Sequence, residues 1–236
     1  MTRKRSKSTA EDKIEYGTTI LPPLATFVIV FGVYMSTVSP SIAGGDSGEL
    51  LAEGCQLGTP HPPGYPLYMI ITYVVKSIGG FFGSRSVALY MNMISCLFGA
   101  IACALVTSSV LIITTKSCSY QHNHRRDLAV EDTTTYRLCA CSAMTMGFLC
   151  AFSPLMWQYS VTSEVFALNN FFVALVVHLT LTIASNGGTG WIDFGAFVCG
   201  LALTNQVRCK RALHSNTPYF LLQIIFKLSC SISLEQ

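Results

Sequence analysis

Residues 44–68 have the sequence GGDSGELLAEGCQLGTPHPPGYPLY. Its glycines and prolines favour turns, and its ionisable side chains are Asp46, Glu49, Glu53 and His61. The stretch directly follows the uncharged run 18–38, which is about as long as the ~20 residues that cross a membrane. Ionisable groups at the point where a helix leaves the bilayer are poor anchors for that helix. We therefore interpret residues 44–68 as a functional site beside a membrane.

The composition of the whole chain predicts the fold class. Of its 236 residues, 51% are hydrophobic and 11% are charged, and the mean hydropathy is +0.48. Soluble domains are about 25% charged, so we expect an all-α, multi-span helical membrane protein without a separate soluble domain. The net charge of +3 is too small to indicate a nucleic-acid partner, and we expect none.

The ten cysteines do not indicate a disulfide framework or a metal centre. Six of them lie in apolar runs, where cysteine behaves as a small hydrophobic residue, and these are Cys96, Cys103, Cys139, Cys141, Cys150 and Cys199. The pair Cys139-x-Cys141 lacks zinc-ligand spacing and has no second pair nearby. The sequence also lacks the motifs of phosphate-binding loops, serine hydrolases and zinc peptidases. We therefore expect no metal site.

The basic residues predict the orientation of the first helices. The polar segment 1–16 and the segment 116–137 are both rich in basic residues, so both are expected to be cytosolic. An even number of crossings must separate them, yet three apolar runs lie between, namely 18–38, 65–82 and 87–115. The run 65–82 contains a lysine and two adjacent glycines and has a proline-rich start. We expect it to lie as a helix at the non-cytosolic face, packed against the bundle.

Residues 41–43 resemble a signal-peptidase site, but we expect the first span to be an uncleaved anchor. The apolar run before them exceeds the ~7–15 apolar residues of a signal peptide. Three further runs follow the second basic segment, and 138–159, 165–184 and the shorter 191–206 are expected to cross in turn. This topology places one set of polar residues on the non-cytosolic face, namely Asp46, Glu49, Glu53, His61, Glu164, Asn205 and Gln206.

Asp46 has two interpretations from the sequence alone. It follows two glycines and precedes Ser47-Gly48, as a residue that caps a helix does. A carboxylate beside an apolar interface also has a raised pKa, which suits a general base. His61, before two prolines, is either an anion ligand or a structural hydrogen-bonding residue. Glu164 either lines a cleft or ends a helix in solvent.

Four segments resemble the transmembrane protein 260 family of protein O-mannosyltransferases. They are GDSGEL at 45–50, GTPHPPGYPLY at 58–68, SPL at 153–155 followed by EVFALN at 164–169, and GLALTNQ at 200–206. They occur in the order and spacing of the family. The resemblance covers about residues 17–206 and implies the N-terminal part of a GT-C glycosyltransferase module, in which juxtamembrane helices flank the first lumenal loop.

The resemblance implies an enzyme of the endoplasmic reticulum membrane with a cytosolic N-terminus and a lumenal Asp46 loop. Its donor would be dolichyl-phosphate mannose, with no further cofactor. Its acceptor would be a Ser or Thr hydroxyl in the IPT-type domains of secretory-pathway receptor ectodomains. Asp46 is implied as the base of an inverting transfer, supported by Glu49. The residues implied to bind the lipid phosphate or line the substrate cleft are His61, Tyr65, Glu164 and Asn205.

One departure from the family separates two hypotheses. After residue 206 the sequence diverges, and 207–236 are expected to form a weakly inserting, poorly ordered tail, as in a C-terminally shortened form. The chain is then either an active mannosyltransferase or a non-catalytic form, such as an inactive short form or a regulatory fragment that keeps the lipid-binding face. A transporter is disfavoured because it should carry ionisable residues at mid-membrane, where His178 is the best candidate.

Overall fold

The structure is a computed structural model, and it describes residues 3–79, 86–124, 132–186 and 191–205. All regular secondary structure in these residues is helical, which confirms the expected all-α class. The helices are α1 (Arg3–Ser36), α2 (Ser47–Gln56), α3 (Pro66–Gly79), α4 (Val87–His124), α5 (Asp132–Ala151), α6 (Pro154–Ser160), α7 (Val165–Asn186) and α8 (Ile192–Asn205).

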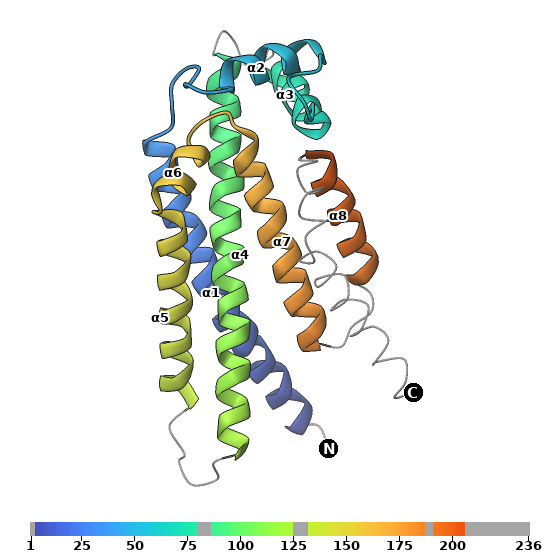
Figure 1. Ribbon diagram of the computed structural model, residues 1–236. Coiled ribbons are helices and arrows are strands. Elements are labelled where there is room, and N and C mark those ends of the chain that lie inside the picture. The colour runs from blue at the N-terminus through green and yellow to red at the C-terminus, as the bar shows by residue number, and fades with distance from the viewer. Residues whose placement is uncertain (1–2, 80–85, 125–131, 187–190, 206–236) are drawn as a thin grey trace.

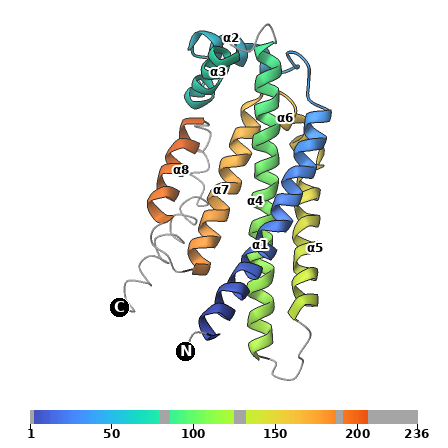
Figure 2. The same ribbon diagram turned by 180° about the vertical axis from the view of Figure 1, so that it is seen from behind.

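Helix α4 is the centre of the bundle. It runs along the length of the molecule and packs against α1, α5 and α7 (Figure 1). Helices α2 and α3 lie across the end where α1 stops and α4 begins, and we call this the α2–α3 end. The view from behind shows α8 beside α7, and α3 lies beyond the upper end of α8 (Figure 2). The start of α1 and the C-terminal end of α4 lie at the opposite end (Figure 1). The chain therefore leaves the first basic segment along α1 and returns to the second along α4.

Two of the described helices are long and apolar enough to cross a membrane, over the ranges Val87–Cys118 and Val165–Ser185. A third span is formed if the bent pair Thr134–Ala151 and Pro154–Ser160 is counted as one. The apolar parts Ile20–Ser36 and Ile192–Asn205 fall short of this length criterion. The chain is a multi-pass membrane protein, with fewer clear spans among the described residues than the five expected from the sequence.

Helix α3 is not among the described helices that are long enough to cross a membrane, and its position at the non-cytosolic face stays a prediction. Its 14 residues extend about 21 Å, which is less than the ~30 Å of a bilayer core. It packs against α2, α4 and α8 and closes the α2–α3 end. The ammonium of Lys76, which weakened this run as a span, donates to the Cys55 carbonyl of α2 at 2.9 Å.

The expected span over 138–159 is bent and not continuous. The chain bends by 68° between α5 and α6. Pro154 lies in the first turn of α6, where proline is tolerated, and Ser153 before it takes an extended conformation with φ −64° and ψ 138°. The Tyr34 hydroxyl donates to the Ala151 carbonyl at 2.7 Å and so satisfies an acceptor that the end of α5 leaves free.

Both basic segments are largely helical where the structure describes them. Helix α1 begins at Arg3, within the segment 1–16, and α4 and α5 extend into the segment 116–137. Lysine, arginine, alanine and glutamate are good helix formers, so a charged segment that adjoins a span can continue its helix. Gln206 and the tail 207–236 lie outside the described residues.

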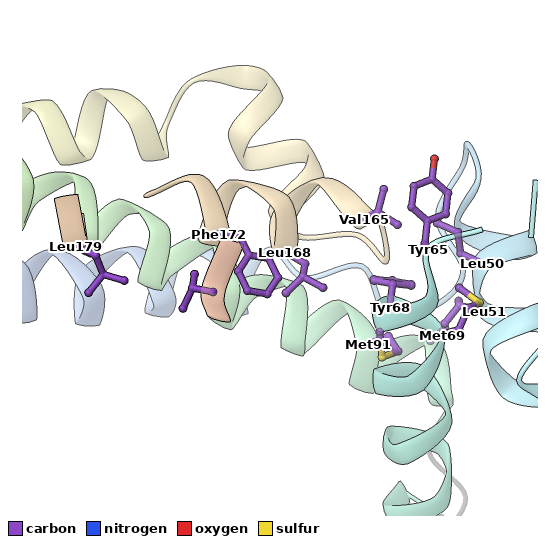
Figure 3. Packing of buried hydrophobic residues seen from close by; sticks show 12 residues of the cluster. Leu50, Leu51, Tyr65, Tyr68, Met69, Met91, Val165, Leu168, Phe172 and Leu179 are labelled. Carbon is purple, nitrogen blue, oxygen red and sulfur yellow. The ribbon is translucent and has the colours of Figure 1, made fainter. Parts of the chain in front are cut away.

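The apolar core joins the α2–α3 end to the long helices. One buried cluster runs from the middle of α7 through the start of α4 to α2 and α3 (Figure 3). Its members include Leu168 and Phe172 of α7, Met91 of α4, Tyr68 of α3 and Leu50 of α2, all at most 5% exposed. A second cluster joins α1, α4, α5 and α6. The first cluster therefore anchors the two short helices that carry the polar stretch.

Candidate active site

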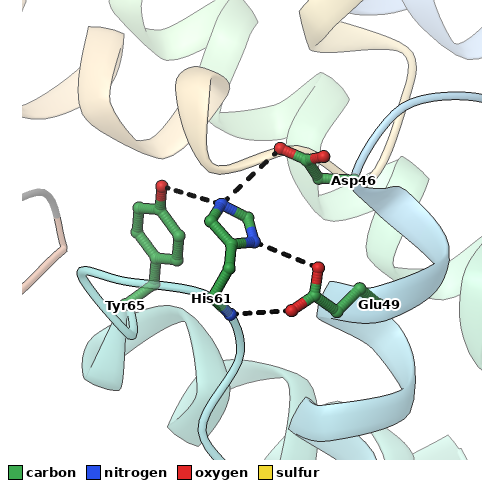
Figure 4. A network of polar contacts seen from close by, with 4 residues as sticks. All are labelled: Asp46, Glu49, His61 and Tyr65. Carbon is green, nitrogen blue, oxygen red and sulfur yellow. Dashed lines mark hydrogen bonds and ion pairs between the residues drawn. The ribbon is translucent and has the colours of Figure 1, made fainter.

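His61 is the centre of a polar network at the α2–α3 end (Figure 4). Its backbone N–H donates to Glu49 Oε1 at 2.7 Å, and its ring Nδ1 lies 3.1 Å from Glu49 Oε2. Its Nε2 lies 3.7 Å from Asp46 Oδ2 and 3.5 Å from the Tyr65 hydroxyl. The Tyr65 ring meets the imidazole edge-on, with centroids 5.6 Å apart. The network thus joins the start of α2 to the loop before α3.

Asp46 occupies the N-cap position of α2, but its side chain makes no capping hydrogen bond. The backbone is in the helical region, with φ −81° and ψ −1°, instead of the extended conformation typical of a capping residue. The carboxylate faces the His61 ring, and the side chain is 60% exposed. This geometry disfavours the capping interpretation and leaves an accessible carboxylate that could accept a proton from a bound hydroxyl.

Glu49 is held as an anion by His61. The hydrogen bond from the His61 backbone N–H, followed by that from its ring, lowers the pKa of the Glu49 carboxyl. A carboxylate that is stabilised in its charged form is a poorer proton acceptor. Its two contacts fix the His61 backbone and ring together, so the geometry suits Glu49 to a supporting role.

Glu164 is not a solvated helix end, because it is only 6% exposed. It lies just before α7, and its carboxylate accepts a hydrogen bond from the Asp46 backbone N–H. A Cβ at Gly45 would lie 3.0 Å from Glu164 Oε1, and Gly45 has φ +76°, so both space and conformation favour glycine there. Burial, and then the charge of Asp46, raises the pKa of Glu164 to about 7.

The raised pKa of Glu164 predicts that the protein becomes less stable as the pH rises. The folded state holds the proton up to pH ~7, whereas an unfolded glutamate loses it near pH ~4.3. The protonated group therefore contributes stability below pH ~4, and this contribution is lost as the pH rises through 7. Thermal unfolding between pH 5 and 8 should show the decline in the native chain and a weaker one in Glu164→Gln. Equal declines would contradict the assignment.

The structure separates the predicted residues into two groups. Asp46, Glu49 and Tyr65 each contact His61, and Glu164 touches the Asp46 backbone, so these five lie together at the α2–α3 end. Asn205 reaches the same end but is fully buried, where its Nδ2 donates to the Val165 carbonyl at 3.3 Å. Asn205 therefore lies apart from the network around His61, and its ligand-binding role stays a prediction. Glu53 lies outside the network around His61. Gln206 lies outside the described residues.

Sequence reasoning missed Asn92 and Ser163, which lie buried directly behind the network. Asn92 Nδ2 donates to the carbonyls of Ser39 and Ser41, and the Ser163 hydroxyl donates to Asn92 Oδ1. The available signal was an asparagine inside the uncharged run 87–115, because a strongly polar residue in a membrane span needs a partner. The sequence alone could not show what that partner is.

The match to known proteins agrees with the geometry of this end. The family model of the protein O-mannosyl-transferase TMEM260 N-terminal domain matches residues 46–222. The chain is 33% identical to the mouse protein O-mannosyl-transferase TMEM260 over 215 residues, which are 89% of this chain and 27% of the relative. It is 30% identical to the Dictyostelium discoideum protein O-mannosyl-transferase tmem260 over 207 residues, which are 82% of this chain and 22% of the relative. No solved structure matches it significantly.

These matches have two consequences. The chain spans about a quarter of the length of the curated relatives that it matches. The family model nevertheless begins at Asp46 and includes every residue of the network around His61. Because this model covers most of the chain, the chain belongs to the family of the protein O-mannosyl-transferase TMEM260 N-terminal domain.

Proposed function

We propose that the chain carries the active site of a protein O-mannosyltransferase that uses dolichyl-phosphate mannose. Family membership supports the class of reaction, and the exposed Asp46 carboxylate beside His61 is the observation that carries the proposal. The site lies at one end of a helical membrane bundle. A donor with a lipid tail in the bilayer and its sugar at the surface could reach this position.

The proposed transfer is a single displacement that inverts the anomeric carbon. A Ser or Thr oxygen of the acceptor bonds to C1 of mannose as the bond from C1 to the phosphate oxygen breaks, and dolichyl phosphate leaves. The hydroxyl proton passes to the Asp46 carboxylate. Glu49 holds His61, whose Nε2 lies between Asp46 and Tyr65, and we place the donor's phosphate near this ring.

We further propose that the acceptors are IPT-type domains of receptor ectodomains and that the α2–α3 end lies in the lumen of the endoplasmic reticulum. Mannose transfer by the purified chain in nanodiscs tests this function, with the mouse relative as the positive control for the assay. Addition of one hexose mass to a purified IPT domain is the expected result. If the relative modifies the acceptor and a folded chain does not, the chain is the non-catalytic form.

The proposed orientation can be tested with glycosylation acceptors, since the native sequence has no Asn-x-Ser/Thr site. The double substitution Ile42→Asn with Gly44→Thr creates one at the α2–α3 end, where Ile42 is 60% exposed and a Cβ at Gly44 has nothing within 4 Å. Arg125→Thr creates one at Asn123, at the opposite end. Expression with endoplasmic reticulum membranes should glycosylate the double variant and leave Arg125→Thr unmodified. The reverse pattern would overturn the orientation.

A further inference from the structure

A single buried side chain of α4 contacts both loops that carry the candidate carboxylates. Asn92 is fully buried, and its Nδ2 donates to the Ser39 carbonyl at 2.7 Å and the Ser41 carbonyl at 3.0 Å. Its Oδ1 accepts from the hydroxyl of Ser163, which is also fully buried. Both amide protons and the amide oxygen of Asn92 are thus used. Residues 39 and 41 precede Asp46, and residue 163 precedes Glu164.

The two loops also bond to each other. The Ser39 backbone N–H donates to the Val161 carbonyl at 3.1 Å, and the Trp157 ring N–H donates to the Thr37 hydroxyl at 3.0 Å. The last contact between them is the hydrogen bond from the Asp46 backbone N–H to the Glu164 carboxylate. Contacts therefore run from α4 through both loops to the backbone of Asp46.

The loop before Asp46 has little else to hold it. None of residues 37–46 is buried, although the half-buried Val38 packs against the second apolar cluster. The part of the loop nearer Asp46 gains little from apolar packing and should open readily without its hydrogen bonds. Its buried hydrogen bonds should therefore determine where the loop lies, because any other loop position would leave these buried groups unpaired, which costs free energy. The placement of Asp46 relative to Glu164 thus depends on a residue that touches neither carboxylate.

We propose that Asn92 is a positioning residue, which sets the separation of Asp46 and Glu164 by tying the loops 37–46 and 161–164 to α4. Its importance for transfer rests on the proposed function of Asp46. The tie itself is a property of the folded chain and does not depend on that function. It also explains how Glu164 stays buried beside the titratable groups that face it. The charges of Asp46 and His61 affect the pKa of Glu164, and the charge of Glu164 affects the pKa of Tyr68.

Hydrogen exchange at the Ser39 and Asp46 amides tests the proposal, because each donates across the two loops. In the purified full chain in nanodiscs, Asn92→Leu keeps a similar volume and removes three hydrogen bonds, so both amides should exchange at least about tenfold faster. Ser163→Ala removes one of these bonds and should accelerate exchange by about fivefold. The matched control is Asn170→Leu, since the amide of half-buried Asn170 donates to Met156 Sδ at 3.2 Å and not to either loop backbone. It should leave both amides unchanged.

A second readout distinguishes positioning from general stability. The carboxyl of Glu164, followed by infrared difference spectroscopy with Glu164→Gln to assign the band, should titrate nearer the ordinary glutamate range in Asn92→Leu, as the loops open to water. It should keep its native midpoint in Asn170→Leu. If Asn92→Leu does not fold, the exchange of Ser163→Ala decides the question.

The outcomes separate this proposal from the proposed function. Native exchange rates in a folded Asn92→Leu, or equal acceleration in Asn170→Leu, would overturn the positioning role, whether or not the chain transfers mannose. Faster exchange with a shifted Glu164 midpoint would support it even if the native chain failed to modify any acceptor. In a preparation that does transfer mannose, Asn92→Leu should lower kcat about tenfold and leave KM for the donor nearly unchanged, because Asn92 does not contact the network around His61.

Discussion

Replacing Asp46 by asparagine should reduce mannose transfer by at least ~10²-fold and leave the protein folded. Asparagine preserves the size of the side chain but cannot accept the acceptor's proton, and a general base typically contributes ~10²–10⁴-fold. The Asp46 side chain is 60% exposed and makes no capping hydrogen bond, so the change in the free energy of unfolding should be about 0.5 kcal/mol or less. The two expectations concern independent quantities.

The measurement needs a protein that transfers mannose. A graft in which residues 46–205 of this chain replace the matching segment of the mouse relative supplies the remaining length of the family. Initial rates of transfer and thermal unfolding should be measured for the graft and its Asp46→Asn variant. Near-native rates in a folded Asp46→Asn graft would exclude Asp46 as the base. A variant that loses its fold would show a structural role that the exposed position does not predict.

Replacing Glu49 by glutamine should lower the rate of transfer less, by roughly tenfold, which is below the ~10²-fold expected for the base itself. Glutamine keeps one acceptor for the His61 backbone N–H but loses the charge that faces the ring Nδ1. His61 should then turn more freely beside Asp46. The measurement is the rate of the same graft, with exchange at the His61 amide as a structural readout.

Glu53→Gln is the matched control, since Glu53 lies one turn further along α2 and outside the network around His61. It should change neither the rate nor the exchange of the His61 amide. An equal loss of rate in Glu53→Gln would indicate that the negative charge of α2 as a whole is what matters. A larger loss in Glu49→Gln than in Asp46→Asn would exchange the roles proposed for the two carboxylates.

Patterns of charge and hydropathy were sufficient to predict the class of fold and the composition of the α2–α3 end. The argument from basic segments placed Asp46, His61 and Glu164 at one end, where the structure has them. This prediction succeeds because the membrane imposes a simple rule on length and charge. The same argument predicts that 65–82 does not cross, and this stays a prediction.

Other features depend on tertiary contacts that no local pattern encodes. The bend between α5 and α6, just before Pro154, was missed because hydropathy reports only how apolar a segment is and not whether its helix is straight. Glu164 was left open between solvent and a cleft, since its burial depends on how α7 begins relative to Asp46. Asn92 contacts residues more than fifty positions away in sequence. Its role could be seen only once both loops were placed on α4.

The most direct test of the central claim is whether the graft with residues 46–205 of this chain transfers mannose at all. Purified graft, dolichyl-phosphate mannose and an IPT domain should yield an acceptor heavier by one hexose, with an α-linked mannose if the β-linked donor is inverted. We predict this product, with the mouse relative giving the same modification under identical conditions. A graft that folds and inserts like the relative but leaves the acceptor unmodified would contradict the claim that this segment carries a working O-mannosyltransferase site.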